Sequence, residues 1–239
     1  MKKGGDPGAP SEGPAIHSPA EAPEQVGILI ADDHELLRRG LCAVLAERTD
    51  WKVVGEAANG REAVRLAASL KPAAVVLDVT MPELNGLEAT RQILAAAPQT
   101  RVLILSVHES EQIVREVLEA GAQGYLLKSD AGRELVKAID ALLGNKPYFT
   151  STVARMVLKG FLSAPRAESS SDETGRLSPR ERETVQLLAE GRSNKEVAAM
   201  LGISVKTAET HRNNVMQKMG FHSITELVRY AVRNKLIEP

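Results

Sequence analysis

The chain has 239 residues and a net charge of −1, and its length suits two ordinary domains better than one. Its single cysteine, Cys42, excludes an internal disulfide and suits a reducing compartment, and we expect it to be a small core residue. No apolar stretch approaches the ~20 residues that a membrane span needs. Lys2 and Lys3 are not followed by the apolar segment of a secretory signal. We therefore expect a cytoplasmic protein that does not bind a membrane.

Two stretches of biased composition divide the chain. Residues 1–25 are rich in Pro, Gly, Ala and Glu, and we expect them to be disordered. Residues 164–175 contain a run of serines and acids that indicates a flexible linker. We therefore place a first domain at 26–145, a linker with one candidate helix at 146–175, and a second domain at 176–239. The second domain has 11 Lys and Arg against 7 Asp and Glu, a balance that suits nucleic-acid binding.

The first domain alternates apolar runs with helical periodicity. Runs of small and β-branched residues predict buried parallel strands at residues 26–31, 52–57, 73–77, 101–105 and 123–127. Helical spacing predicts helices at residues 34–47, 60–70, 86–97, 110–120 and 131–143. This alternation predicts a parallel sheet with helices on both faces, and it leaves the strand order open.

Four of the predicted strands are followed directly by a residue with a charged or hydroxyl side chain. Asp32 and Asp33 follow the first strand, Asp78 the third, Ser106 the fourth and Lys128 the fifth. In an open α/β sheet, ligands bind at the C-terminal edge of the strands, where these side chains would meet. Three carboxylates at one place repel one another unless a cation lies between them, and their oxygens suit Mg²⁺. With the hydroxyl and the amine added, the set can hold a metal and a phosphoryl group.

The second domain shows repeated helix start and stop signals. Serines precede four helical segments, at residues 179–190, 194–201, 205–219 and 224–235, and glycines follow the first three. Four short helices of this kind predict a helix-turn-helix domain, with the third as the recognition helix. Its polar side chains are candidates for DNA contacts: Glu209, Thr210 and Asn213 for base edges, and Lys206, Thr207, His211 and Arg212 for phosphates. The alternative is a solvated polar face, which any small bundle would show.

Several of these residues together resemble a known family. Asp32-Asp33, Asp78 followed by Met81-Pro82 and Gly86, Ser106, and Tyr125 three residues before Lys128 resemble the receiver domain of bacterial two-component response regulators. The blocks at 194–198 and 205–211 resemble the LuxR-type helix-turn-helix signature, so the whole chain is similar to the NarL/FixJ family. The resemblance implies a flavodoxin-like, five-stranded sheet of order 2-1-3-4-5 before an all-α domain of four helices.

The resemblance also implies a role for each residue of the set. Asp78 would accept a phosphoryl group from a sensor histidine kinase. Mg²⁺ would be bound directly by Asp33 and through water by Asp32, with Asp78 and the main-chain carbonyl of Thr80 as further ligands. Lys128 and Ser106 would contact the phosphoryl oxygens, and Tyr125 would rotate inward as the second member of a switch pair with Ser106. The chain would then be a phosphorylation-controlled transcriptional regulator and not a turnover enzyme.

Other interpretations compete with these roles. Asp32 or Asp33 could be the N-cap of the next helix, Asp78 a turn residue, Lys128 a solvated lysine, and Tyr125 a half-buried aromatic on an edge strand. His34 and His108 match no zinc spacing, and we expect both to be surface residues. A phosphatase of the haloacid dehalogenase type would need a second acid two residues after Asp78, where Thr80 stands. A regulator that works without phosphorylation would not need the complete acid, hydroxyl and lysine set.

One recognition helix reads too few base pairs for useful specificity in a genome. We therefore expect a homodimer on double-stranded DNA, with inverted half-sites about one helical turn apart. We also expect the unphosphorylated first domain to cover the third helix of the second domain.

Overall fold

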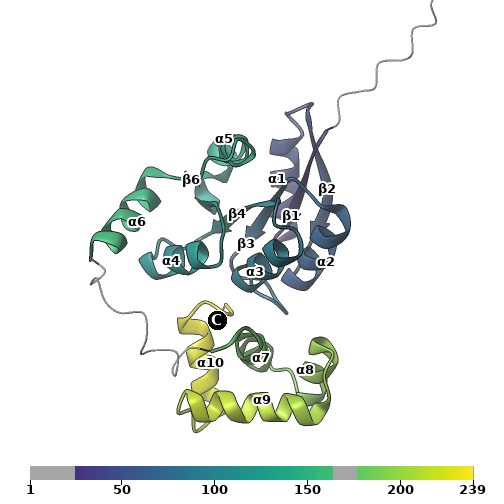
Figure 1. Ribbon diagram of the computed structural model, residues 1–239, viewed down its shortest axis with the longest axis vertical. Helices are drawn as coiled ribbons and strands as arrows, with labels where there is room; N and C mark the ends of the chain where they lie inside the picture. Colours follow the sequence, from purple (N-terminus) through teal and green to yellow (C-terminus); the bar gives the residue numbers. More distant parts are fainter. Residues whose placement is uncertain (1–24, 164–176, 239) are drawn as a thin grey trace, which may run out of the picture.

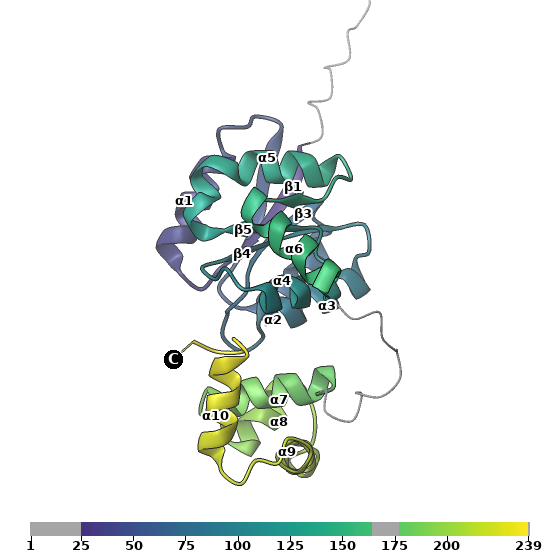
Figure 2. The same ribbon diagram turned by 90° about the vertical axis from the view of Figure 1, so that its left-hand side faces the viewer.

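The computed structural model describes residues 25–163 and 177–238. The first range forms an α/β domain and the second a helical bundle that lies against it (Figures 1 and 2). The expectations about residues 1–24 and about the linker at 164–175 fall outside the described residues.

The sheet is parallel throughout, and the expected order of its first five strands is confirmed. It runs β2-β1-β3-β4-β5-β6. The strands are β1 (Val26–Ala31), β2 (Trp51–Ala57), β3 (Ala74–Asp78), β4 (Arg101–Ser106), β5 (Gly124–Leu127) and β6 (Tyr148–Phe149). The sequence analysis missed β6, because two residues are too few to show a strand period. In the register, Gly124 pairs with Tyr148 and Tyr125 with Phe149, so β5 is not an edge strand.

Helices cover both faces of the sheet, as predicted. They are α1 (Glu35–Leu45), α2 (Gly60–Leu70), α3 (Gly86–Ala96), α4 (Glu111–Glu119) and α5 (Ala131–Leu143). One buried cluster joins the sheet to α2, α3 and α4, and a second joins it to α1 and α5. Cys42 lies at the margin of the second cluster and is half-buried, so it is not the core residue that we expected.

A helix after β6 continues the first domain past its expected end. This helix, α6 (Ser151–Ser163), lies beside α4 in Figure 1. Its Val153 is fully buried in the cluster that also contains Tyr125, and Met156 and Val157 pack against that cluster. Helix α6 therefore belongs to the packed body of the first domain.

The second range contains the four predicted helices, α7 (Pro179–Ala189), α8 (Asn194–Leu201), α9 (Val205–Lys218) and α10 (Ile224–Arg233). They enclose a separate core that includes Val185, Ala208, Val215 and Leu227. Each helix begins at a serine whose side chain accepts a backbone N–H, so the local start signals set these boundaries. Across the described ranges, no helix is long and apolar enough to cross a membrane.

Candidate functional site

The three acids predicted to meet do meet, at the C-terminal edge of the sheet. Asp78 is the last residue of β3, and Asp32 and Asp33 follow β1 directly. Asp32 is 0% exposed and Asp78 only 3% exposed. One side-chain atom from each of Asp32, Asp33, Asp78 and His34 lies within 4.8 Å of all the others. The sheet therefore concentrates negative charge at a place with little access to water.

Lys128 is the cation that this charge requires. Its Nζ lies 2.9 Å from Oδ2 of Asp32 and 2.8 Å from Oδ2 of Asp78. The pKa of Asp78 is raised to about 7, mainly by burial. The nearby Lys128 ammonium lowers this pKa by a smaller amount, and the negative charges of Asp32 and Asp33 raise it further. Burial lowers the pKa of Lys128, but Asp78 and Asp32 outweigh it, so its pKa lies above the usual value. Lys128 therefore remains an ammonium group between two buried carboxylates.

The same carboxylates fit a divalent metal ion. The Lys128 ammonium lies within ion-pair distance of the Oδ2 atoms of both Asp32 and Asp78. One ammonium cannot balance three carboxylates, and hard carboxylate oxygens are the ligands that Mg²⁺ prefers. The site is thus an acidic pocket of the kind that is typical of Mg²⁺ binding.

His34 belongs to this cluster, which the sequence analysis did not foresee. It is the N-cap residue of α1, and its N–H donates to Oδ1 of Asp32 at 2.8 Å. Neither acid is therefore the N-cap. The His34 ring is 59% exposed, as expected, but its Nδ1 lies 2.9 Å from Oδ1 of Asp33. The signal in the sequence that points to this contact is the place of His34 directly after Asp33.

The proposed switch residues Ser106 and Tyr125 bind the backbone of one residue, His108. The His108 N–H donates to Oγ of Ser106 at 3.0 Å, and the Tyr125 hydroxyl donates to the His108 carbonyl at 2.6 Å. Both side chains are 0% exposed. The interpretation of Tyr125 as a half-buried aromatic on an edge strand is thus wrong. Its ring already lies inside, without a prior inward rotation.

The loop after Asp78 is packed tightly against the start of α3. The N–H of Gly86 donates to the carbonyl of Val79 at 2.8 Å. A Cβ at Gly86 would lie 2.0 Å from the carbonyl oxygen of Asp78, so no other residue fits there. Thr80, on this loop, is 8% exposed. The role of its main-chain carbonyl as a metal ligand stays a prediction.

The candidate DNA-contacting side chains lie along the open side of α9. Lys206, Thr207, Thr210 and Asn213 are exposed, and Glu209, His211 and Arg212 are half-exposed. Ala208 and Val215 face the core of the bundle. Figures 1 and 2 both place α9 on the side of the bundle that faces away from the sheet. The expectation that the first domain covers this helix is therefore wrong, because α7 makes the contact instead.

The contact between the domains uses polar side chains of α7. Arg182 donates to Glu88 of α3 at 3.2 Å, and Glu183 accepts from Gln92 of α3 at 3.0 Å and from Arg61 of α2 at 3.1 Å. This contact could not be predicted from the sequence, because polar residues on a helix do not indicate a partner about 100 residues away.

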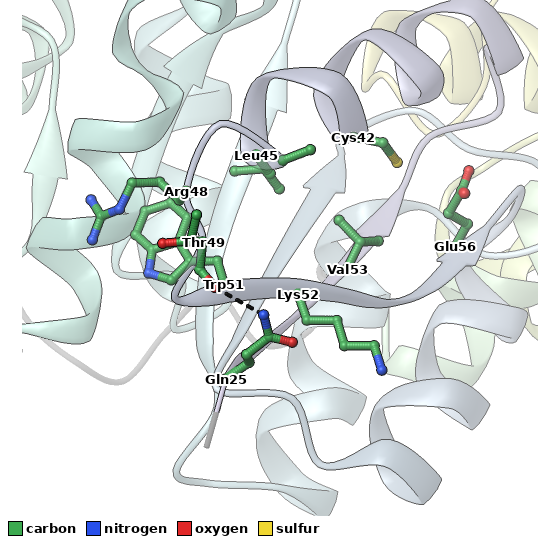
Figure 3. Close-up of a pocket in the computed structure, with 10 residues that line it drawn as sticks. Gln25, Cys42, Leu45, Arg48, Thr49, Trp51, Lys52, Val53 and Glu56 are labelled. Carbon is green, nitrogen blue, oxygen red and sulfur yellow. Dashed lines mark hydrogen bonds between the residues drawn. The ribbon is translucent and has the colours of Figure 1, made fainter. Parts of the chain in front are cut away.

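A separate hollow of about 610 Å³ lies between α1 and β2 (Figure 3). Two of the polar side chains that line it have partners: Gln25 donates to the carbonyl of Thr49, and Arg48 pairs with Asp50. Burial raises the pKa of the Cys42 thiol, which makes it a poor nucleophile. The hollow shows no arrangement suited to chemistry.

An acidic, lysine-bridged pocket at the edge of a parallel sheet, followed by a helix-turn-helix, defines a response regulator. Two family models match: the response regulator receiver domain at residues 28–140, and bacterial regulatory proteins of the luxR family at residues 175–231. The chain belongs to the two-component response regulators with a LuxR-type DNA-binding domain. It is a phosphorylation receiver that regulates transcription by binding DNA.

Individual relatives agree with this family. The oxygen regulatory protein NreC of Staphylococcus aureus (strain bovine RF122 / ET3-1) is 37% identical over 214 residues, which cover 88% of this chain and 99% of that protein. A structure of the RcsB response regulator of Salmonella typhimurium is 27% identical, with a TM-score of 0.52, and covers 87% of this chain and 100% of that chain. RcsB has also been solved as two dimers bound to two parallel DNAs, at 27% identity and a TM-score of 0.53, covering 86% of this chain and 97% of that one.

Proposed function

We propose that Asp78 is the phosphoacceptor and that a phosphohistidine of a sensor histidine kinase is the donor. A carboxylate oxygen of Asp78 forms the new bond to phosphorus as the bond from phosphorus to the histidine nitrogen breaks. The electron pair of that bond stays on the imidazole, which takes up a proton. The product is an acyl phosphate, and the regulator does not turn over as an enzyme.

The observation that carries this proposal is the position of Lys128, bridging two buried acids at 2.8 and 2.9 Å. In that position its ammonium can offset charge on the transferring oxygens, and the Ser106 hydroxyl can donate to one of them. Asp32, Asp33, Asp78 and the main-chain carbonyl of Thr80 are the residues that would hold Mg²⁺. A Mg²⁺ ion held by these residues would offset charge on the phosphoryl group.

The output that we propose is binding of a homodimer to inverted half-sites in double-stranded DNA, in the cytoplasm. RcsB dimers bound to DNA support the dimer by analogy. The exposed face of α9 supports the assignment of Glu209, Thr210 and Asn213 to bases, and of Lys206, Thr207, His211 and Arg212 to phosphates. In this proposal the first domain, which begins at residue 26 and includes α6, receives the phosphoryl group, and residues 176–239 bind DNA.

The direct test is phosphorylation by a small acyl phosphate with Mg²⁺, followed by mass spectrometry of the intact protein. The parent should gain one phosphoryl group and Asp78→Asn none. Asp140→Asn is the matched control, because Asp140, on α5, is an exposed acid paired with Arg48. An undiminished adduct in Asp78→Asn would refute the assignment.

A further inference from the structure

Arg38, on helix α1, joins the acid cluster to strand β2. Its Nη1 donates to the main-chain carbonyl of Asp32 at 2.8 Å, and its Nε donates to a carboxylate oxygen of Glu56 at 3.1 Å. Glu56 lies near the end of β2, and Asp32 directly follows the neighbouring strand β1. One guanidinium group thus ties α1 to the ends of two adjacent strands, at the edge of the sheet where the acids meet.

The carbonyl that Arg38 binds belongs to the peptide group between Asp32 and Asp33. A peptide group is planar, so its carbonyl oxygen and the nitrogen of the next residue turn together. On the other side of Asp32, its N–H donates to the carbonyl of Ala57 at 3.2 Å. The backbone of Asp32 is therefore held by β2 on one side and by Arg38 on the other. Because Asp33 leaves the chain from the peptide group that Arg38 holds, Arg38 also sets the direction of the Asp33 side chain.

Asp33 depends on its backbone more than the other two acids do. Asp32 is 0% and Asp78 only 3% exposed, and the Lys128 ammonium pairs with both of them. The Asp33 side chain, by contrast, is 34% exposed, and it contacts the ring of His34, which is itself 59% exposed. A carboxylate binds a metal ion more tightly when its neighbours orient it in advance. For Asp33 the held backbone supplies this orientation.

The guanidinium of Arg38 suits this task. Its donors form a rigid fork that can bind two acceptors at a fixed angle, and its side chain is only 15% exposed. The ion pair with Glu56 would stabilise the fold little by itself, because the Glu56 side chain is 45% exposed. Its effect is to turn the guanidinium toward the Asp32 carbonyl. The next arginine, Arg39, differs, because it is 74% exposed and pairs with Glu35 on the same helix.

We propose that Arg38 is a positioning residue for the metal site. It fixes the peptide group after Asp32, so that the Asp33 carboxylate is already turned for direct contact with Mg²⁺, and Glu56 orients Arg38. Loss of a group that supports a metal ligand in this way costs about 10- to 100-fold in metal affinity. This inference rests on the metal site in the proposed function, and it does not depend on phosphoryl transfer to Asp78.

The first test titrates the metal-free, full-length protein with Mg²⁺ and measures the dissociation constant by calorimetry. Arg38→Met removes both hydrogen bonds and one positive charge, and it should weaken Mg²⁺ binding about tenfold. Loss of the charge alone would do the opposite, because a cation binds more tightly once a neighbouring cation is gone. Arg39→Met removes the same charge from the same helix, and it should stay within about twofold of the parent, since exposed charges are screened. The direction of the change therefore separates positioning from charge.

A second pair of variants leaves Arg38 in place, so that the test does not depend on the folding of Arg38→Met. Glu56→Gln and Glu56→Met lose the same negative charge, but only Gln keeps an oxygen that can accept from Nε of Arg38. Glu56→Met should therefore bind Mg²⁺ about two- to fivefold more weakly than Glu56→Gln, as expected for the loss of one hydrogen bond. Circular dichroism verifies that each variant is folded before the titration.

Equal or tighter Mg²⁺ binding by folded Arg38→Met would overturn the inference, and so would equal binding by the two Glu56 variants. A parent protein that bound no Mg²⁺ would overturn it together with the proposed metal site. If the parent bound Mg²⁺ but gained no phosphoryl group on Asp78, the proposed function would fall. Weaker Mg²⁺ binding by Arg38→Met would in that case still support the role of Arg38.

Discussion

The hydroxyl of Tyr125 donates a 2.6 Å hydrogen bond to the main-chain carbonyl of His108, which holds the loop after β4 from inside the domain. The N–H of the same residue donates to Ser106, so two side chains from adjacent strands fix one peptide segment. A movement of Ser106 toward a phosphoryl group would therefore shift the His108 backbone and alter its hydrogen bond with Tyr125.

Replacing Tyr125 by Phe should remove this link and leave the buried ring in place. The His108 carbonyl loses its partner, so the free energy of unfolding should fall by about 1 kcal/mol. Phosphodonor should also stimulate DNA binding less than in the parent. Tyr148→Phe is the control, since the Tyr148 hydroxyl binds Glu134 on α5, and it should leave the stimulation intact. An unchanged response of Tyr125→Phe would contradict the role of this bond.

Ser106→Ala and Lys128→Ala should each weaken the coupling between phosphorylation and DNA binding. The Ser106 hydroxyl is expected to bind a phosphoryl oxygen, and the Lys128 ammonium to offset its charge. Binding to an operator should be titrated with and without phosphodonor after circular dichroism has verified that each variant is folded. If both variants respond as the parent does, the proposed relay is wrong.

The burial of Asp78 should make the metal-free protein less stable at high pH. Because its pKa is raised to about 7, the folded state binds a proton that the unfolded state loses near pH 4, so stability falls as pH rises between these values. Asp78→Asn lacks this titration, so its free energy of unfolding should exceed that of the parent by about 2–4 kcal/mol at pH 8. At pH 4 the two free energies should differ little. Denaturant unfolding in a chelating buffer measures this. Equal pH profiles would contradict it.

Two substitutions on α9 should have different effects on DNA binding. Asn213→Ala should relax the sequence preference at one position, whereas Lys206→Ala should weaken binding to all sequences and flatten its salt dependence. Affinities for a set of operator variants at several salt concentrations separate the two. Gln217→Ala, exposed near the end of α9, should change neither quantity. A sequence-dependent loss in Lys206→Ala would remove its assignment to a phosphate.

The active protein should occupy DNA as a dimer. Sedimentation analysis of the complex at saturating phosphodonor should give two chains for each specific operator, and footprinting should show two inverted half-sites about one helical turn apart. One chain for each operator would refute the dimer.

The sequence was sufficient to predict the acid cluster, because each acid stands at the end of a strand and parallel strands bring their ends together. It was also sufficient for the four C-terminal helices, whose serine caps act within a few residues. It did not reveal the hydrogen bond from His34 to Asp32, or those that join His108 to Ser106 and Tyr125, because these bonds depend on local backbone geometry. The hydrogen bond from the Gln186 amide of α7 to the Met81 carbonyl joins positions 105 residues apart, and a buried glutamine looks like a solvated one in the sequence.

The packing of Val153 bears on how the first domain can be isolated. A fragment that ended at residue 145, the expected boundary, would lack both β6 and α6. The backbone of β5 would then form an unpaired sheet edge, and the buried cluster that contains Tyr125 would lose Val153. A fragment that ends at residue 163 keeps both elements. Measurements of the switch on the shorter fragment would therefore describe an altered surrounding for Tyr125 and not the switch of the intact protein.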